Sequence, residues 1–97
     1  MILRISDEIE KKLRERHHVD QFEILQCFEN QLRSALIDER EEHKTDPPTQ
    51  WFISETDSGR RLKVVFIQLS ALEALIKTAY EPDANEERIY QRFSARL

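Results

Sequence analysis

Two basic residues, Arg61 and Lys63, closely follow Gly59, the only glycine of the sequence. In an extended strand alternate side chains point to opposite faces, so both cations would share one face. Two neighbouring cations can stabilise the negative charge that develops around phosphorus when RNA is cleaved through its own 2′-hydroxyl. That reaction also needs a base for the hydroxyl proton and an acid for the leaving oxygen. The pair therefore marks a candidate site for chemistry on a phosphodiester.

Three further residues, Arg40, His43 and Tyr80, have side chains that would complete such a site. Arg40 or His43 would assist proton transfer or stabilise charge, and Tyr80 would be a donor or a stacking surface at the rim. Each candidate also has an ordinary alternative role: a solvated hairpin cation, a loop histidine, or a tyrosine in or beside the core. Both interpretations are open at the level of the sequence.

The sequence lacks the motifs of cofactor and metal chemistry. One glycine is too few for the glycine-rich loops that cradle phosphates. His17 and His18 are adjacent and would point apart, and a single cysteine, Cys27, excludes an internal disulfide and a cysteine-rich metal site. We therefore expect a site that uses neither cofactor nor metal.

Length and charge narrow the class of protein. The 97 residues suffice for one domain, which we place over residues 1–97. A net charge of −4 argues against a protein that simply coats nucleic acid, while leaving room for a local basic groove. No apolar run approaches the roughly 20 residues of a membrane span, and the first residues lack the pattern of a secretory signal. We expect a cytoplasmic protein with no membrane association.

A β-hairpin over residues 51–67 is the centre of the predicted fold. Aromatic and β-branched residues are frequent in both 51–56 and 61–67, and the polar segment between them holds Gly59, where a turn requires positive φ. A turn near residues 70–73 and a last strand at 75–80 should follow. Residues 68–75 also have helical propensity, so a helix there is the alternative.

Helices are expected before and after these strands. Asp20-x-x-Glu23 and Asp83-x-x-Glu86 have the spacing of capping boxes, and Ser6 is a suitable N-cap. The other expected elements are a strand at 2–5, helices at 7–16 and 21–31, a strand at 34–37, a loop at 44–49 and a closing helix after residue 83. This order predicts an α+β fold of two layers, with two N-terminal helices, an antiparallel sheet of three or four consecutive strands and a C-terminal helix.

Four segments within residues 16–90 resemble a known family. They are His17-His18-Val19 with the helix that ends at Phe28, Asp38-Glu39-Arg40, the hairpin stretch from Gly59-Arg60 to Val65, and Ala79-Tyr80 followed by Glu86 and Tyr90. Together they are similar to the BrnT-like toxins of bacterial type II toxin–antitoxin systems, which are related in fold to RelE-type ribonucleases.

The resemblance implies a metal-independent ribonuclease toxin with an RNA substrate and an antitoxin protein as its partner. Its catalytic residues would come from Arg40, His43, Arg61, Lys63 and Tyr80. The alternative is a non-catalytic protein-binding module of the same fold, which would need only an exposed apolar patch. An enzyme, in contrast, needs the basic residues gathered at one pocket. The oligomeric state stays open.

Overall fold

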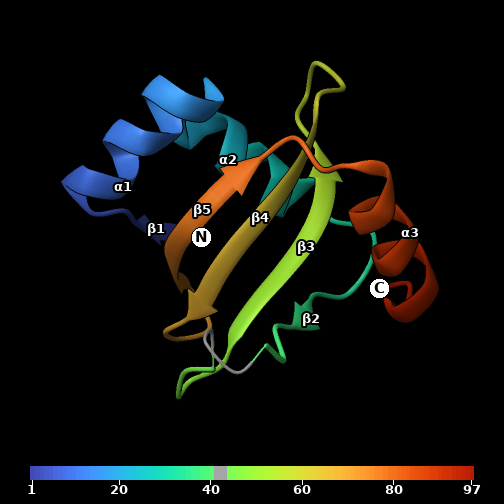
Figure 1. Cartoon of the computed structure of the whole chain (residues 1–97). Coiled ribbons are helices and arrows are strands. Elements are labelled where there is room, and N and C mark those ends of the chain that lie inside the picture. The colour runs from blue at the N-terminus through green and yellow to red at the C-terminus, as the bar shows by residue number, and fades with distance from the viewer. Residues whose placement is uncertain (41–43) are drawn as a thin grey trace.

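A computed structural model describes residues 1–40 and 44–97 of the chain. It has an α+β fold built on one five-stranded sheet with the strand order β1-β5-β4-β3-β2 (Figure 1). In chain order the elements are β1 (Ile2–Arg4), α1 (Asp7–Lys12), the π-helical turn η1 (Leu13–His17), α2 (Gln21–Glu29), β2 (Leu36–Ile37), β3 (Thr49–Glu55), β4 (Arg61–Gln68), β5 (Glu73–Tyr80) and α3 (Ala84–Phe93). The prediction of an α+β fold with consecutive antiparallel strands and a closing helix is confirmed in this coarse form.

The sheet is mixed, which the predicted purely antiparallel arrangement did not include. Strands β2 to β5 pair antiparallel in sequence order, but β1 pairs parallel with β5, Ile2 lying opposite Glu73. The first strand of the sequence therefore pairs with the last one, β5. The predicted strand at 34–37 is reduced to Leu36–Ile37.

The hairpin forms where the sequence predicted it. Strands β3 and β4 pair from Thr49 opposite Ile67 to Glu55 opposite Arg61. Gly59 has a φ of 88°, a conformation that disfavours side chains, and its amide donates to the carbonyl of Thr56 at 2.9 Å. The turn thus needs its glycine for backbone geometry, since nothing lies within 4 Å of the position that a Cβ would take.

Residues 68–75 form a turn and the start of a strand, so the helical alternative is wrong. The amide of Leu69 donates to the carbonyl of Glu73 at 2.9 Å, and β5 begins at Glu73. Ala74 and Ile76 are fully buried on the core face of β5, and this burial outweighs local helical propensity. The register with β4 shifts between Val65 and Phe66.

The caps of the helices also agree with the sequence. Asp20 and Asp83 each begin a capping box, and the Ser6 hydroxyl accepts from the amide of Ile9. The helix expected over 7–16 changes at Leu13 into the π-helical turn, which ends at His18 with a φ of 53°. The second helix ends at Glu29, two residues earlier than expected.

The core lies between one face of the sheet and the N-terminal helices. Phe28 on α2 packs edge-on against Phe52 and Phe66, with ring centroids 4.9 and 5.2 Å apart. Ile24 and Cys27 are fully buried beside them. Among the described residues, the other face of the sheet is covered at one side, where α3 lies next to β3 (Figure 1). That arrangement leaves an open sheet face bordered by α3, and the predicted site residues of β4 and β5 lie on it.

Candidate functional site

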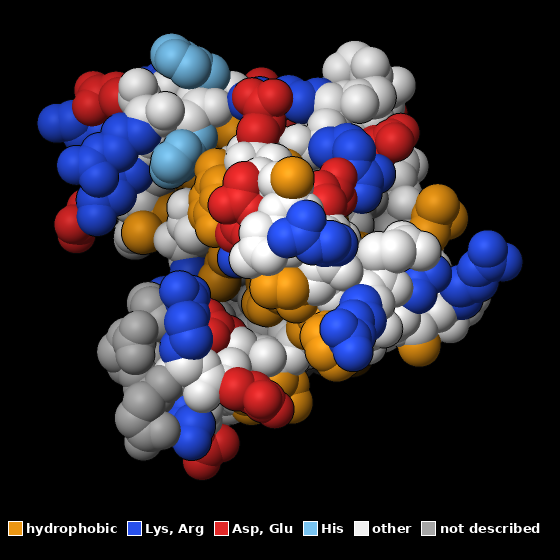
Figure 2. Space-filling view, turned by 45° about the vertical axis from the view of Figure 1, so that its right-hand side comes forward, with side chains coloured by type: hydrophobic (Ala, Val, Ile, Leu, Met, Phe, Trp, Pro, Cys, Tyr) orange, Lys and Arg blue, Asp and Glu red, His pale blue; other side chains and the backbone are white. Residues whose placement is uncertain are grey.

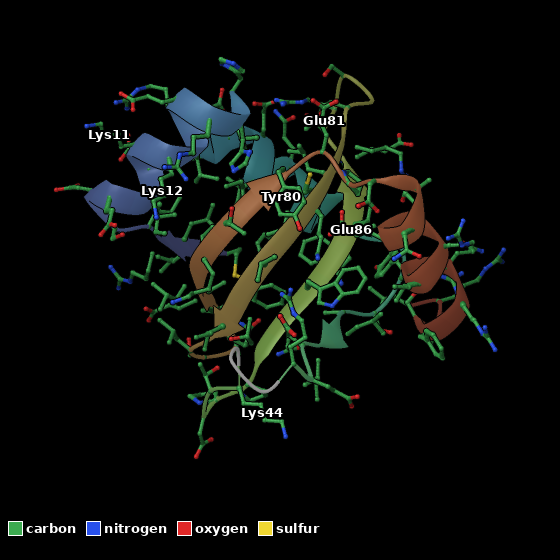
Figure 3. The ribbon with its side chains drawn as sticks, in the orientation of Figure 1. Lys11, Lys12, Lys44, Tyr80, Glu81 and Glu86 are labelled. Atoms are coloured by element: carbon green, nitrogen blue, oxygen red, sulfur yellow. The ribbon has the colours of Figure 1, made fainter. Side chains whose placement is uncertain are left out.

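A hydrogen-bonded cluster of three side chains lies where α3 meets the open face of the sheet. Lys63 on β4 and Tyr80 on β5 are cross-strand partners, and both donate to the same carboxylate oxygen, Oε2 of Glu86 on α3, at 2.7 Å. Figure 3 shows Tyr80 and Glu86 approaching one another from the sheet and from the start of α3. The other oxygen, Oε1, accepts from the amide of Asp83 at 3.0 Å. The capping box that starts α3 therefore also holds the carboxylate in place.

Aromatic rings surround the ammonium group of Lys63. Its Nζ lies 4.5 Å from the centroid of the Trp51 ring and 5.6 Å from that of Tyr80. On α3, the ring of Tyr90 lies 5.7 Å from that of Trp51. Lys63 is only 8% exposed, a value that a lysine reaches when its charge is paired and its stem is packed.

The contacts within the cluster shift the pKa values of Glu86 and Tyr80. Burial alone would raise the pKa of Glu86, but hydrogen bonds from Lys63, the Asp83 amide and Tyr80 outweigh it and lower that pKa. Burial, followed by the hydrogen bond to Glu86, raises the pKa of Tyr80. Glu86 is therefore a carboxylate that accepts three hydrogen bonds, and Tyr80 keeps its proton.

The cluster opens into a groove of about 630 Å³ between β2, β3, β4 and α3. Trp51 and Lys63 from the sheet, Glu86 from α3 and Arg40 from the segment after β2 all line this groove. The guanidinium of Arg40 donates to both carboxylate oxygens of Asp38, at 3.1 and 2.9 Å. The remaining lining residues are Leu36, Ile37, Asp38, Glu39, Asn85, Ile89 and Phe93. Apolar and charged side chains thus line the groove in equal number, a mixture that can bind a ligand with both apolar and charged parts.

The structure brings some of the predicted site residues together and separates others. Arg40 and Lys63 line the groove, and Tyr80 reaches it through Glu86. Arg61 turns away: its guanidinium binds the carboxylate of Glu87 at 2.6 and 2.8 Å and lines a neighbouring hollow of about 840 Å³. His43 lies outside the described residues.

Glu86 is the group that sequence reasoning did not assign to the site. Its position in Asp83-x-x-Glu86 predicted a capping role, which it fulfils. The contact with Lys63 joins residues 23 positions apart and depends on how α3 docks on the sheet. The only hint in the sequence was the Glu86 and Tyr90 pair, whose spacing places both on one side of a helix.

The described residues also bear on metal, thiol and membrane-spanning sites. No group of three or more His, Cys, Asp and Glu side chains there is arranged to hold a metal ion. Burial raises the pKa of Cys27 to about 12, so this thiol is not an activated nucleophile. None of the described helices combines the length and the apolar content needed to cross a membrane.

No protein-family model matches the sequence, and a search of curated proteins found no significant match.

Proposed function

We propose that the groove beside Lys63 is the active site of a metal-independent ribonuclease, and that the protein acts as the toxin of a bacterial toxin–antitoxin pair. The observation that carries the proposal is the cluster itself: Lys63, Tyr80 and Glu86 supply a cation, a protonated hydroxyl and a carboxylate at the side of one groove. Arg40 adds a second cation to the lining of the groove. These are the group types that RNA cleavage without a metal requires.

The proposed reaction uses the RNA's own nucleophile. The 2′-hydroxyl oxygen bonds to the adjacent phosphorus while the bond from phosphorus to the 5′-oxygen breaks, leaving a 2′,3′-cyclic phosphate and a 5′-hydroxyl. The 2′-hydroxyl proton passes to Glu86, and the leaving 5′-oxygen takes a proton from Tyr80. Lys63 stabilises the charge on the equatorial phosphate oxygens. A phosphate that draws Lys63 away from Glu86 also removes a hydrogen bond that lowers the pKa of this carboxylate, which makes it a better base.

Arg61 has no place in this assignment, although it was a sequence candidate. Its charge is balanced by Glu87, with Glu55 3.4 Å away, and the three side chains tie β3 and β4 to α3. In the proposal the phosphate-binding role therefore belongs to Lys63 with Arg40. The proposed antitoxin is the product of a neighbouring gene, and it would cover the groove.

The test is cleavage of a fluorescent single-stranded RNA in the presence of a metal chelator. We compare the wild-type chain with Lys63→Met, which keeps the packed stem and removes the charge, and with Lys11→Met as the matched control. Lys11 lies on α1, on the other side of the molecule from α3 (Figure 3). Lys63→Met is expected to lower the rate by about 10²–10³-fold, the usual effect of losing a charge-stabilising group, and Lys11→Met to leave it unchanged.

Two results would refute the ribonuclease proposal. One is a wild-type chain, folded by circular dichroism, that leaves RNA intact and does not arrest growth when expressed in bacteria. The other is cleavage that survives Lys63→Met at the wild-type rate. A second measurement, urea unfolding, separates loss of the site from loss of the fold in the variant.

A protein-binding groove without catalysis is the second candidate, and the apolar rim favours it. Ile37, Phe93 and Ile89 are 56, 63 and 38% exposed, and all three line the groove. If RNA stays intact, the expected result is that the product of an adjacent gene co-purifies with the wild-type chain. Phe93→Ser should then abolish co-purification, whereas Leu72→Ser, at a site 66% exposed outside the groove, should not.

A further inference from the structure

Helix α3 separates its charges between two faces. The acidic residues Glu86 and Glu87 face the sheet and neutralise Lys63 and Arg61. The basic residues Arg88 and Arg92 lie on the exposed face, and neither has an ion pair within residues 1–40 and 44–97. The positive charges of Lys63 and Arg61 on the sheet are thus neutralised, and Arg88 and Arg92 place positive charge on the outside of α3.

An exposed aromatic ring lies beside Arg92. Phe93 is 63% exposed, and the guanidinium carbon of Arg92 lies 5.3 Å from the centroid of its ring. Phe93 also lines the groove that holds Lys63, so its ring lies between that groove and Arg92. Figure 2 shows the same association on the side that carries α3, where basic side chains lie among hydrophobic ones.

We infer that the outer face of α3 binds single-stranded RNA next to the bond that is cleaved. Arg88 and Arg92 would each contact a backbone phosphate, and Phe93 would stack on a base that leaves the groove. Residues four apart on a helix are about 6 Å apart along its axis, which lets neighbouring phosphates meet successive arginines. Cations combined with a stacking ring are the usual means of holding single-stranded RNA.

The surface favours RNA over an acidic protein segment as the occupant. A protein interface would be expected to present a broad apolar centre, and the exposed large hydrophobic residues of α3 are only Ile89 and Phe93. The ring of Phe93 is already in contact with a guanidinium, which is an arrangement suited to stacking. The inference rests on the proposed function, because it takes the groove to hold the scissile phosphate.

The test measures binding and is independent of cleavage. The probe is a fluorescein-labelled twelve-nucleotide RNA with 2′-O-methyl groups, which cannot be cleaved, and the readout is fluorescence anisotropy over a range of salt concentrations. The wild-type chain is compared with Arg88→Gln, Arg92→Gln and with a control of equal charge change, Lys11→Gln, Arg16→Gln, whose residues are exposed on α1 and η1.

The double α3 variant is expected to bind about tenfold more weakly at low salt. The slope of log affinity against log salt should become shallower by about 1.4, since each phosphate contact to a single strand contributes about 0.7. Phe93→Ala should weaken binding by about tenfold with little change in slope, because stacking releases few counterions. The α1 and η1 control should bind as the wild type does.

Three results would overturn the inference: no RNA binding by the wild-type chain, an equal loss in the control, or no loss in the α3 variant. Binding of an acidic peptide through Arg88 and Arg92 without binding of RNA would also overturn it, in favour of a protein partner. Failure of the proposed ribonuclease function alone would give a different result from these. In that case the methylated RNA still binds through α3, but unmodified RNA remains uncleaved.

Discussion

At the scale of single residues, Glu86 carries out two tasks with its two oxygens. Oε1 closes the capping box at Asp83, and Oε2 accepts from Lys63 and Tyr80. The side chains of Lys63 and Glu86 are only 10 and 19% exposed, so water replaces little of this interaction. Removing the charge of Glu86 would leave Lys63 buried without its anion, which is more costly than losing an exposed pair.

Glu86→Gln is therefore expected to lower the free energy of unfolding by about 2 kcal/mol at pH 7. Glutamine can still close the capping box, so the loss reports on Lys63. Glu87→Gln is the matched control, because its partner Arg61 is 45% exposed and its own side chain 33% exposed. That control should lose less than about 1 kcal/mol. Urea unfolding measures both, and equal losses would contradict the assignment.

The comparison of the wild-type chain with Glu86→Gln also gives a prediction for how stability depends on pH. Because the folded-state pKa of Glu86 is lowered, its contribution is fully present above the unfolded value near 4.5 and is lost as pH falls through the lower folded value. The stability difference between wild type and Glu86→Gln should therefore shrink as the pH is reduced from 7 to 3. A difference that grows toward acid pH would show the opposite sign of the shift.

Lys63 and Tyr80 were candidates from the sequence and lie in this cluster, whereas Arg61 was also a candidate and does not. Strand alternation correctly placed Lys63 on the open face, and Tyr80 followed from the end of the last strand. The direction of Arg61 was not predictable, since it depends on Glu87 and therefore on how α3 docks. Strand alternation constrains the face of a residue, but the partner of a long, flexible side chain is set by tertiary packing.

At the scale of elements, Arg60 joins the hairpin turn to two other segments. Its guanidinium donates to the carbonyls of His17 and His18 at 2.9 and 2.7 Å and to the carboxylate of Glu23 at 3.1 Å. Burial would lower the pKa of Arg60, but hydrogen bonds from this guanidinium to Glu23 and Glu81 outweigh it and raise the pKa. The end of η1 and the start of α2 are thus fixed by one residue of the hairpin.

Arg60→Leu is expected to lower the free energy of unfolding by about 3 kcal/mol, because two carbonyls and a carboxylate lose their donor. Arg61→Leu is the neighbouring control and should cost less, since Arg61 is 45% exposed whereas Arg60 is 23% exposed. Chemical denaturation at pH 7 compares them. A smaller loss at Arg60 than at Arg61 would mean that the guanidinium does not hold these segments together.

Local signals predicted most of these elements, and non-local contacts explain the exceptions. The capping boxes at Asp20 and Asp83 and the turn at Gly59 were readable because their rules involve residues close in sequence. The π-helical turn had no such signal. The parallel pairing of β1 was also missed, because its partner β5 begins at Glu73 and no local pattern selects so distant a neighbour.

At the scale of the whole molecule, Cys27 reports on the integrity of the core. The thiol is fully buried, and burial, with the nearby charge of Glu23, raises its pKa to about 12. Iodoacetamide at pH 8 should therefore label the native protein at least about 10³-fold more slowly than the protein in urea, as expected for a core that opens rarely. Mass spectrometry measures the labelling, with Cys27→Ala as the blank. Comparable rates in both states would mean that α2 detaches readily.

The pairing of β1 with β5 has a consequence during synthesis. A ribosome releases residue 2 long before residue 73, and the separation of 73 − 2 = 71 residues takes roughly 4–14 s at 5–20 residues per second. During that time β5 has not been made. Strand β1 therefore has no strand to pair with, and η1, which begins at the core residue Leu13, has no strand to contact. Glu86 follows Lys63 by 86 − 63 = 23 residues, so Lys63 lacks its anion until that much more of the chain has been made. The newborn chain therefore completes its sheet only after Glu73 has been translated, and neutralises Lys63 only after Glu86 has been translated.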